Sequence, residues 1–380
     1  MDKNDLLPIL SFILIAILLK QTFLISPNLT FDDQTYLTLA NQFLNGTYQI
    51  TSSPYGYGFL FIILTACLGP ALELLSFMGI LIVAYSLLKH YYPANIAITT
   101  TLGLELSCFM FLYSGRVLPD MPVGLLIALS TYIMLVKPRY SMIAGFLLGF
   151  TIFFKFGGFI LPILLLAYCN PLIACFALLA LGGCTVYCIY RRKPRLSMAF
   201  ILGVLIAIAL YQCFIPAGQS VFTLAHQYDA LQISLSQATW YSNILLLPAF
   251  IGGYGIGTNY FAQVFPLGAL FIFALVGSFM VLKSKDRNMK MASAAFWLGL
   301  LYLMFGTESL AGYVLITVVS RYMITFAIVI ALLAAHFMNC IYQRKPKLSV
   351  LLILLAIIIM SNVPMYIYFG IYHSIIFHFG

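Results

Sequence analysis

Charged side chains are scarce in this sequence: they make up 8% of its 380 residues, and only 10 residues are Asp or Glu. A soluble domain usually carries about 25% charged residues, so the composition excludes an ordinary soluble protein. Hydrophobic residues instead make up 63% of the chain. Apolar runs of about 20 residues recur along it, as is typical of helices that cross a bilayer. We therefore expect an integral membrane protein with many spans.

Other absences narrow the fold and its chemistry. Short alternating segments are missing, whereas continuous runs such as LSVLLILLAIIIM favour helices. The eight cysteines mostly fall inside apolar runs, without the clustered Cys/His spacing of a zinc site. The first apolar run lacks a clear cleavage site of small residues, so we interpret it as a retained span. The sequence predicts an all-α protein in which residues 1–380 form one transmembrane domain.

The 19 lysines and arginines are gathered in clusters between the apolar runs. A net charge of +9 is compatible with a nucleic-acid partner, but basic clusters of this kind mark the cytoplasmic loops of membrane proteins, and we expect no nucleic acid. The clusters are Lys89, Lys137 with Arg139, RRKPR at 191–195, KSKDRNMK at 283–290 and QRKPK at 343–347.

Placing all of these clusters on one side predicts about eleven crossings, with the N-terminus inside and the C-terminus outside. The predicted spans lie near residues 6–26, 57–88, 94–113, 119–136, 141–169, 171–190, 197–215, 262–282, 291–306, 314–337 and 348–370. Segments 57–88 and 141–169 exceed the roughly 20 residues of one crossing. Gly69-Pro70 and Gly157-Gly158 are their expected break points.

The same topology separates the acidic residues from the basic clusters. Half of the carboxylates fall in outer loops or at the outer ends of spans: Asp32, Asp33, Asp120, Asp229 and Glu308. Four basic residues also lie in spans or at their outer ends: Lys20, Arg116, Lys155 and Arg321. Charges in such places are expensive and usually belong to a site. We expect an outward-facing site built from carboxylates and cations.

The first outer loop, residues 27–57, contains a predicted helix from Thr30 to Gly46. Its apolar and acidic positions recur at spacings of three and four: Asp33, Tyr36, Leu37, Ala40, Phe43 and Leu44. A helix of this kind is expected to lie along the membrane surface. Asp32 and Asp33 fall in its first turn, where carboxylates also stabilise the positive end of the helix dipole without any catalytic role.

The stretch DDQTYLTLANQFLNGTYQI resembles the first extracytoplasmic loop of GT-C superfamily membrane glycosyltransferases, in the branch of the protein O-mannosyltransferases and aminoarabinose transferases. Three later stretches fit in the same order. They are RVLPDMPVGLLIALSTYIML at 116–135, AGFLLGFTIFFKFGGFILPILLL at 144–166 and SRYMITFAIVIALLAA at 320–335. Ser53-Pro54 stands where aminoarabinose transferases carry Lys-Pro, which counts against that sugar as the substrate.

The resemblance implies an inverting glycosyltransferase of the plasma membrane with its site on the extracytoplasmic face. The donor would be a polyprenyl phosphate sugar, dolichyl or undecaprenyl, such as dolichyl phosphate mannose. The acceptor would be a hydroxyl of a protein, lipid or glycan. The implied catalytic carboxylates are Asp32 as general base, Asp33 as its rival for that role, and Asp120. The implied substrate contacts are Tyr36, Arg116, Lys155, His226, Arg321 and Tyr322.

Several of these assignments have competing interpretations. Asp120, in LPDMP, also suits the N-cap of the following helix, and Arg116 could either pair with it or meet phosphate. Lys155 lies deep in an apolar run and needs an anion: a lipid phosphate, or Glu73 or Glu105 within the membrane.

The late segments carry open assignments as well. Arg321 beside Tyr322 is also typical of an interfacial anchor. Residues 216–261, which include His226 and Asp229, form the longest outer loop and an expected lid over the acceptor.

No cofactor is expected besides the lipid-linked donor, although a divalent metal held by Asp32 and Asp120 is an alternative. A transporter or flippase of lipid-linked sugar would use the intramembrane charges as its path, but the inverted internal repeat expected of such proteins is not visible in the sequence. A polysaccharide polymerase or ligase would share the chemistry and differ in the acceptor.

The orientation can be tested with single cysteines in an otherwise cysteine-free variant. An impermeant thiol reagent added to intact cells should label a cysteine at Thr47, in the first outer loop, and spare one at Ser197, beside a basic cluster. Equal labelling of the two positions would contradict the prediction that the acidic residues share the outer face of the membrane.

Overall fold

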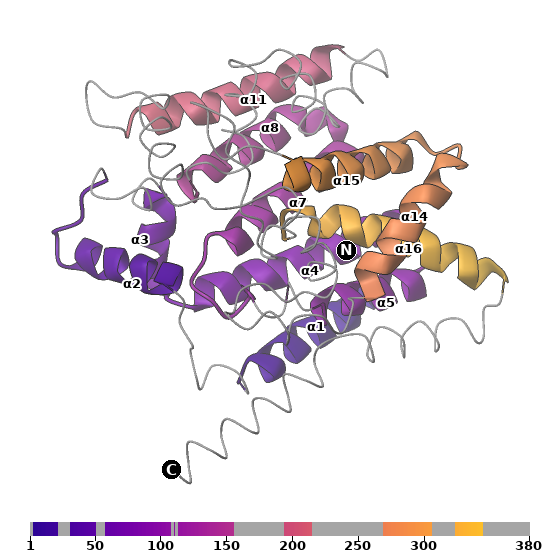
Figure 1. The fold of residues 1–380 in the computed structure, drawn as a ribbon, viewed down its shortest axis with the longest axis horizontal. Helices are drawn as coiled ribbons and strands as arrows, with labels where there is room; N and C mark the ends of the chain where they lie inside the picture. Colours follow the sequence, from indigo (N-terminus) through magenta and orange to yellow (C-terminus); the bar gives the residue numbers. More distant parts are fainter. Residues whose placement is uncertain are drawn as a thin grey trace, which may run out of the picture.

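The computed structural model describes residues 3–21, 31–50, 58–107, 110, 113–155, 194–214, 269–305 and 324–344. Within these ranges every regular element is a helix, as predicted (Figure 1). The α-helices are α1 (Lys3–Gln21), α2 (Phe31–Leu44), α3 (Phe59–Leu68), α4 (Ala71–Tyr91), α5 (Ala94–Glu105), α7 (Asp120–Val136), α8 (Ser141–Phe150), α11 (Pro194–Gln212), α14 (Ala269–Leu282), α15 (Arg287–Phe305) and α16 (Ala327–Arg344). The described 3-10 helices include η2 (Pro138–Tyr140) and η3 (Thr151–Phe153).

Helices α4 and α16 form the centre of the described bundle. Both bury residues around most of their circumference, as expected of helices inside a bundle. Among the described helices, Ala71–Tyr91 and Ile324–Arg344 are long and apolar enough to cross a membrane, whereas the other apolar helices are shorter. The eleven crossings remain a prediction, and the expected spans 171–190 and 348–370 lie outside the described residues.

The long segment 57–88 is broken where the sequence predicts it. Helix α3 ends at Leu68, Gly69 adopts a φ of +55°, and Pro70 precedes the first residue of α4. A positive φ favours glycine, and proline can open a helix but not continue one. In the segment 141–169, helix α8 already ends at Phe150, where the Thr151 hydroxyl donates to the Leu148 carbonyl. Gly157-Gly158 lies outside the described residues.

Two helix ends differ from the expected spans. Helix α5 ends at Glu105 rather than continuing to residue 113, because the Ser107 hydroxyl donates to the carbonyl of Leu104 and competes with helical hydrogen bonds. Helix α16 continues beyond residue 337 to Arg344. No glycine or proline interrupts the segment between residues 337 and 344.

Helices α4 and α7 run in parallel, since Glu73 faces Leu118 while Gly79 faces Leu125. Lys89 near the end of α4 and Lys137 after α7 therefore lie at the same end of the bundle. We call this the basic end. The opposite end of α4, around Glu73, we call the acidic end. The helix rises through sixteen residue steps from Glu73 to Lys89, or about 24 Å, so the two ends are well separated.

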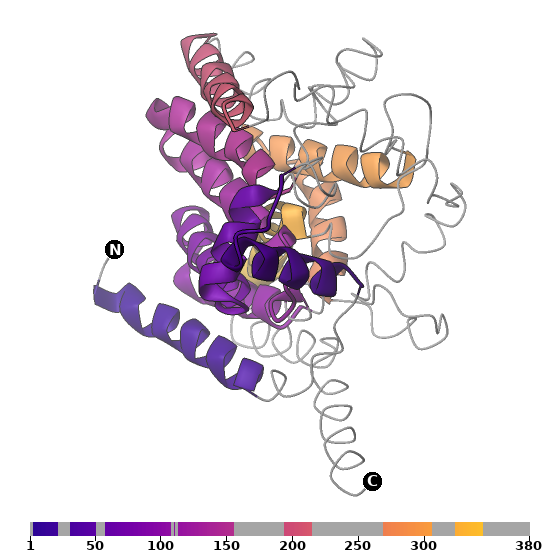
Figure 2. The ribbon, with the colours of Figure 1, turned by 90° about the vertical axis from the view of Figure 1, so that its left-hand side faces the viewer.

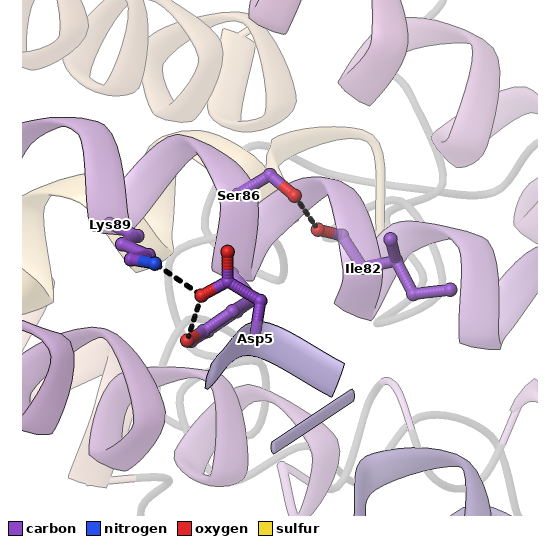
Figure 3. Close-up of polar contacts among 5 residues, drawn as sticks. Asp5, Ile82, Ser86 and Lys89 are labelled. Carbon is purple, nitrogen blue, oxygen red and sulfur yellow. Dashed lines mark hydrogen bonds and ion pairs between the residues drawn. The ribbon is translucent and has the colours of Figure 1, made fainter. Parts of the chain in front are cut away.

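At the basic end, the N-terminal helix is tied to α4 through Asp5. Its carboxylate forms an ion pair with Lys89 and accepts a hydrogen bond from the Tyr85 hydroxyl (Figure 3). The Ser86 hydroxyl donates to the carbonyl of Ile82 within α4. These contacts place Asp5 and Lys89, both predicted to face the cytoplasm, at the same end.

The same end also receives the start of α15. The Asn288 side-chain amide donates to the Tyr91 hydroxyl at 2.9 Å, next to the end of α4. The basic cluster 283–290 therefore lies beside Lys89, in agreement with the prediction that the two share one face.

Helices α8 and α11 pack at unusually short range, and they lie side by side in both views (Figures 1 and 2). A Cβ on Gly145 would lie 1.9 Å from the carbonyl oxygen of Phe200, and one on Gly203 would lie 2.0 Å from that of Met142. Only glycine allows this approach, and small residues at such contacts are typical of helix pairs in membranes.

Replacing Gly203 by Leu should therefore destabilise the protein by forcing the two backbones apart. Overpacking of this kind costs about 1–3 kcal/mol, occasionally more. The matched control is Leu202→Ala, because Leu202 is about half exposed and faces away from α8. Thermal unfolding in detergent measures both variants, and a parent-like melting temperature for Gly203→Leu would contradict the close packing.

Candidate active site

Helix α2 brings the first acidic residues of the site to the bundle. Its buried side chains are Asp33, Tyr36, Leu39 and Ala40, and the Tyr36 ring meets Phe61 of α3 edge to face at 5.0 Å. The predicted helix from Thr30 to Gly46 is therefore confirmed for residues 31–44, and Gly46 ends it with a φ of +70°. Leu44 was expected on the apolar face, but it is 63% exposed because it lies in the last, uncovered turn.

The start of α3 packs against the chain beside Lys155. A Cβ on Gly58, the residue before α3, would lie 2.3 Å from the carbonyl oxygen of Phe154. Phe59 also contacts Phe153 edge to face at 5.5 Å. The backbone N–H of Lys155 donates to the carbonyl of Thr151, which continues the turn of η3. The close approach at Gly58 and the contact between Phe59 and Phe153 together fix the position of the Lys155 backbone.

Residues 113–119 form a tight connection to α7. The N–H of Arg116 donates to the carbonyl of Tyr113, and the N–H of Leu118 donates to that of Arg116. Pro119 occupies the N-cap position, so Asp120 is the first residue of the helix rather than its cap. The expectation that Asp120 caps α7 is thus wrong by one residue, because Pro119 already has the backbone geometry that begins the helix. The Asp120 side chain is buried.

Two ion pairs join these elements. Lys155 Nζ lies 2.8 Å from Asp120 Oδ1, and Arg116 Nη1 lies 3.5 Å from Asp33 Oδ2. The two aspartate side chains are 0–2% exposed, whereas Arg116 is 23% and Lys155 20% exposed. Each cation therefore lies between a buried carboxylate and the accessible surface.

These pairings correct the expected protein partners of both cations. Lys155 pairs with Asp120 rather than with Glu73 or Glu105. Arg116 pairs with Asp33 on α2 rather than with Asp120. Contact of either cation with a phosphate stays a prediction. The spacing of four residues between Arg116 and Asp120 suggested a local pair. Instead, the tight turn at Arg116 and the break before α4 place Asp33 of α2 within reach of the Arg116 side chain.

Glu73 is a third carboxyl side chain in this region, and its position was missed from the sequence. It lies in the first turn of α4, is fully buried, and is close enough to Asp33 for the two carboxylates to repel each other. Its carboxylate also faces the backbone N–H of Leu118, although neither oxygen forms a hydrogen bond of normal geometry within the described residues. Glu73 lies three residues after Pro70, at the acidic end of a predicted span, and this position in the sequence could have indicated that it belongs to the site.

The remaining predicted residues are not placed by the structure. The backbone of Asp32 lies in the first turn of α2, but its side chain is outside what is described. His226, Arg321 and Tyr322 lie outside the described residues altogether, as does the expected lid at 216–261.

The chemistry available in the described part of the site is that of carboxylates and cations. Burial raises the pKa of the Tyr48 phenol, which follows α2, so this hydroxyl stays neutral at physiological pH. Among the described residues no group of three or more His, Cys, Asp or Glu side chains is arranged to hold a metal ion. The metal alternative between Asp32 and Asp120 is untested, because the Asp32 side chain is not described.

The fold can be compared with known proteins. No protein-family model matches the chain, and no curated protein matches its sequence. The chain is similar in structure to the oligosaccharyltransferase of Archaeoglobus fulgidus, solved as a crystal structure in complex with Zn and sulfate. The TM-score is 0.50 with 15% identity, over 93% of this chain and 52% of that enzyme, so the chain spans about half of the relative's length. The likeness is one of fold alone.

The pair of Lys155 and Asp120 can be tested with a double-mutant cycle. Lys155→Met should lower the free energy of unfolding by about 3 kcal/mol, because it removes the cation from a buried carboxylate. Lys155→Met combined with Asp120→Asn should lose clearly less than the sum of the two single changes. Denaturation in detergent gives the four values, with the exposed Lys137→Met as control. Strictly additive losses would mean that the two side chains do not interact.

Proposed function

We propose that the protein is a membrane glycosyltransferase that moves a sugar from a polyprenyl phosphate to a hydroxyl of a protein, lipid or glycan. The observation that carries the proposal is the cluster at the acidic end: the buried carboxyl groups of Asp33, Glu73 and Asp120, together with Arg116 and Lys155. The fold shared with an oligosaccharyltransferase supports a reaction of this class.

Such a transfer needs two kinds of group. When the acceptor oxygen attacks the anomeric carbon, the bond from that carbon to the phosphate oxygen breaks, and the hydroxyl proton passes to a base. The phosphate departs with the bonding electrons, and cations beside it stabilise the developing charge. The acidic end of the bundle combines carboxylates and cations within reach of each other.

We assign the base to Asp32, as the resemblance to the GT-C loop implies. Asp33 is fully buried and held by Arg116, an arrangement better suited to orienting that cation than to meeting an acceptor. Asp120 has the corresponding relation to Lys155. The two buried aspartates thus act as positioning residues for the cations, and Asp32, in the first turn of the same helix as Asp33, takes the proton.

The donor phosphate is assigned to Arg116 and Lys155. Both side chains remain partly exposed while their aspartates are buried, so an anion can reach them from the accessible side. A guanidinium can hold two phosphate oxygens at once, and an ammonium adds a point charge. Arg321, Tyr322 and His226 are proposed as further substrate contacts from segments outside the described residues, as the resemblance implies.

A transporter would also contain buried charges, but along a path through the membrane. Here the two ion pairs lie together at one end of α4 and α7. This gathering favours a reaction site over a path, and the site is proposed to face the extracytoplasmic side of the plasma membrane, opposite the basic end.

The base assignment is tested by Asp32→Asn and Asp33→Asn, assayed with a polyprenyl phosphate sugar. Asp32→Asn should reduce transfer about a hundredfold or more while the melting temperature stays near that of the parent, because asparagine keeps the helix end but cannot accept the proton. If Asp32 only stabilised the helix, the variant would lose up to about 1 kcal/mol of stability and activity would follow the amount of folded protein. If both variants transferred sugar at a rate near that of the parent, neither aspartate would be the base, and Asp120 would become the leading candidate.

A further inference from the structure

The connection between α14 and α15 presents a dense group of cations at the basic end. Residues 283–290, KSKDRNMK, contain four basic residues and one acidic residue. Lys283, Lys285 and Lys290 are exposed, and none of them forms an ion pair within the described part of the chain. Three positive charges therefore face outward, with Asp286 as the one carboxylate within the same turn.

The turn that carries these lysines is held in place. The Ser284 hydroxyl accepts the N–H of Asp286, and the Asp286 carboxylate accepts the N–H of Asn288 at 2.8 Å. Asn288 in turn donates to the Tyr91 hydroxyl. The single acidic group of the turn is thus engaged with the backbone that begins α15, and the lysines project from a fixed frame.

An apolar surface continues from this turn along α14. Val276, Phe279 and Leu282 are 38%, 54% and 59% exposed, and their spacing of three residues puts them on one face of the helix that leads to Lys283. The Phe279 ring also contacts Trp297 of α15 at 5.1 Å, so both helices contribute to this surface. The apolar face complements the acyl chain of an anionic phospholipid, and the lysines at its end complement the charged headgroup.

We propose that this surface binds an anionic phospholipid, with the headgroup at Lys283, Lys285 and Lys290 and an acyl chain along Phe279 and Leu282. Basic side chains next to a membrane attract anionic headgroups, and a fixed turn with several of them favours one binding position over a diffuse layer. The surface lies at the opposite end of the bundle from the acidic cluster, so the proposal is independent of the proposed transferase activity.

The test is a titration of phosphatidylglycerol into delipidated, detergent-solubilised protein, with thermal stability as the readout. The parent should be stabilised by phosphatidylglycerol and much less by phosphatidylcholine. Lys283→Gln combined with Lys285→Gln and Lys290→Gln should weaken the apparent affinity for phosphatidylglycerol roughly a hundredfold, since each lysine near an anionic surface contributes about fivefold.

The control is Lys137→Gln combined with Arg139→Gln, which removes two exposed cations at the same end after α7. This control should respond to phosphatidylglycerol like the parent. An equal loss in the control, or no loss in the triple variant, would overturn the proposal. Stabilisation of the parent by inorganic phosphate alone, to the same extent, would also overturn it, because the ligand would then be a free anion.

Discussion

A buried carboxylate needs a cation or hydrogen-bond donors beside it, and the acidic end of this bundle depends on that constraint. Asp33 and Asp120 come from helices far apart in the sequence, and each is held by a cation from a different segment, Arg116 and Lys155. Removing one partner of such a pair leaves a charge in the interior, which is strongly destabilising. The ion pairs therefore fix the mutual positions of α2, α7 and the chain around Lys155.

Backbone geometry makes these pairs possible. Gly69 and Pro70 break the second apolar segment, so that α3 can turn toward α2 while α4 begins at the acidic end. Gly58 lets the start of α3 approach the backbone beside Lys155 to within a distance that excludes any side chain. The same arrangement buries the carboxyl group of Glu73 close to Asp33, and the described contacts of Glu73 include no cation.

Much of the architecture could be predicted from the sequence, because apolar runs and breakers act locally. The helix of the first loop, the break at Gly69-Pro70 and the shared end of Lys89 and the cluster 283–290 are confirmed. The end of α5 was misplaced, because a span length was assumed where a side-chain hydrogen bond decides the boundary, and α16 was expected to stop at residue 337 but continues at least to Arg344.

The composition of the site could be predicted in part, but its pairing could not. The placement of the few charges against the predicted spans indicated a larger set of residues that includes Asp33, Arg116, Asp120 and Lys155. Which cation meets which carboxylate depends on how helices pack at long range, and sequence spacing carries no such information. For the same reason the sequence suggests Glu73 only as a partner of Lys155, while the structure places it beside Asp33.

The central claim is that the cations at the acidic end receive the donor phosphate. An experimental structure of the protein in a lipid bilayer with bound polyprenyl phosphate tests it most directly. We predict phosphate density within about 3 Å of a nitrogen of Arg116 or Lys155. Phosphate bound at the basic end, or at the acidic end out of reach of both cations, would contradict the claim.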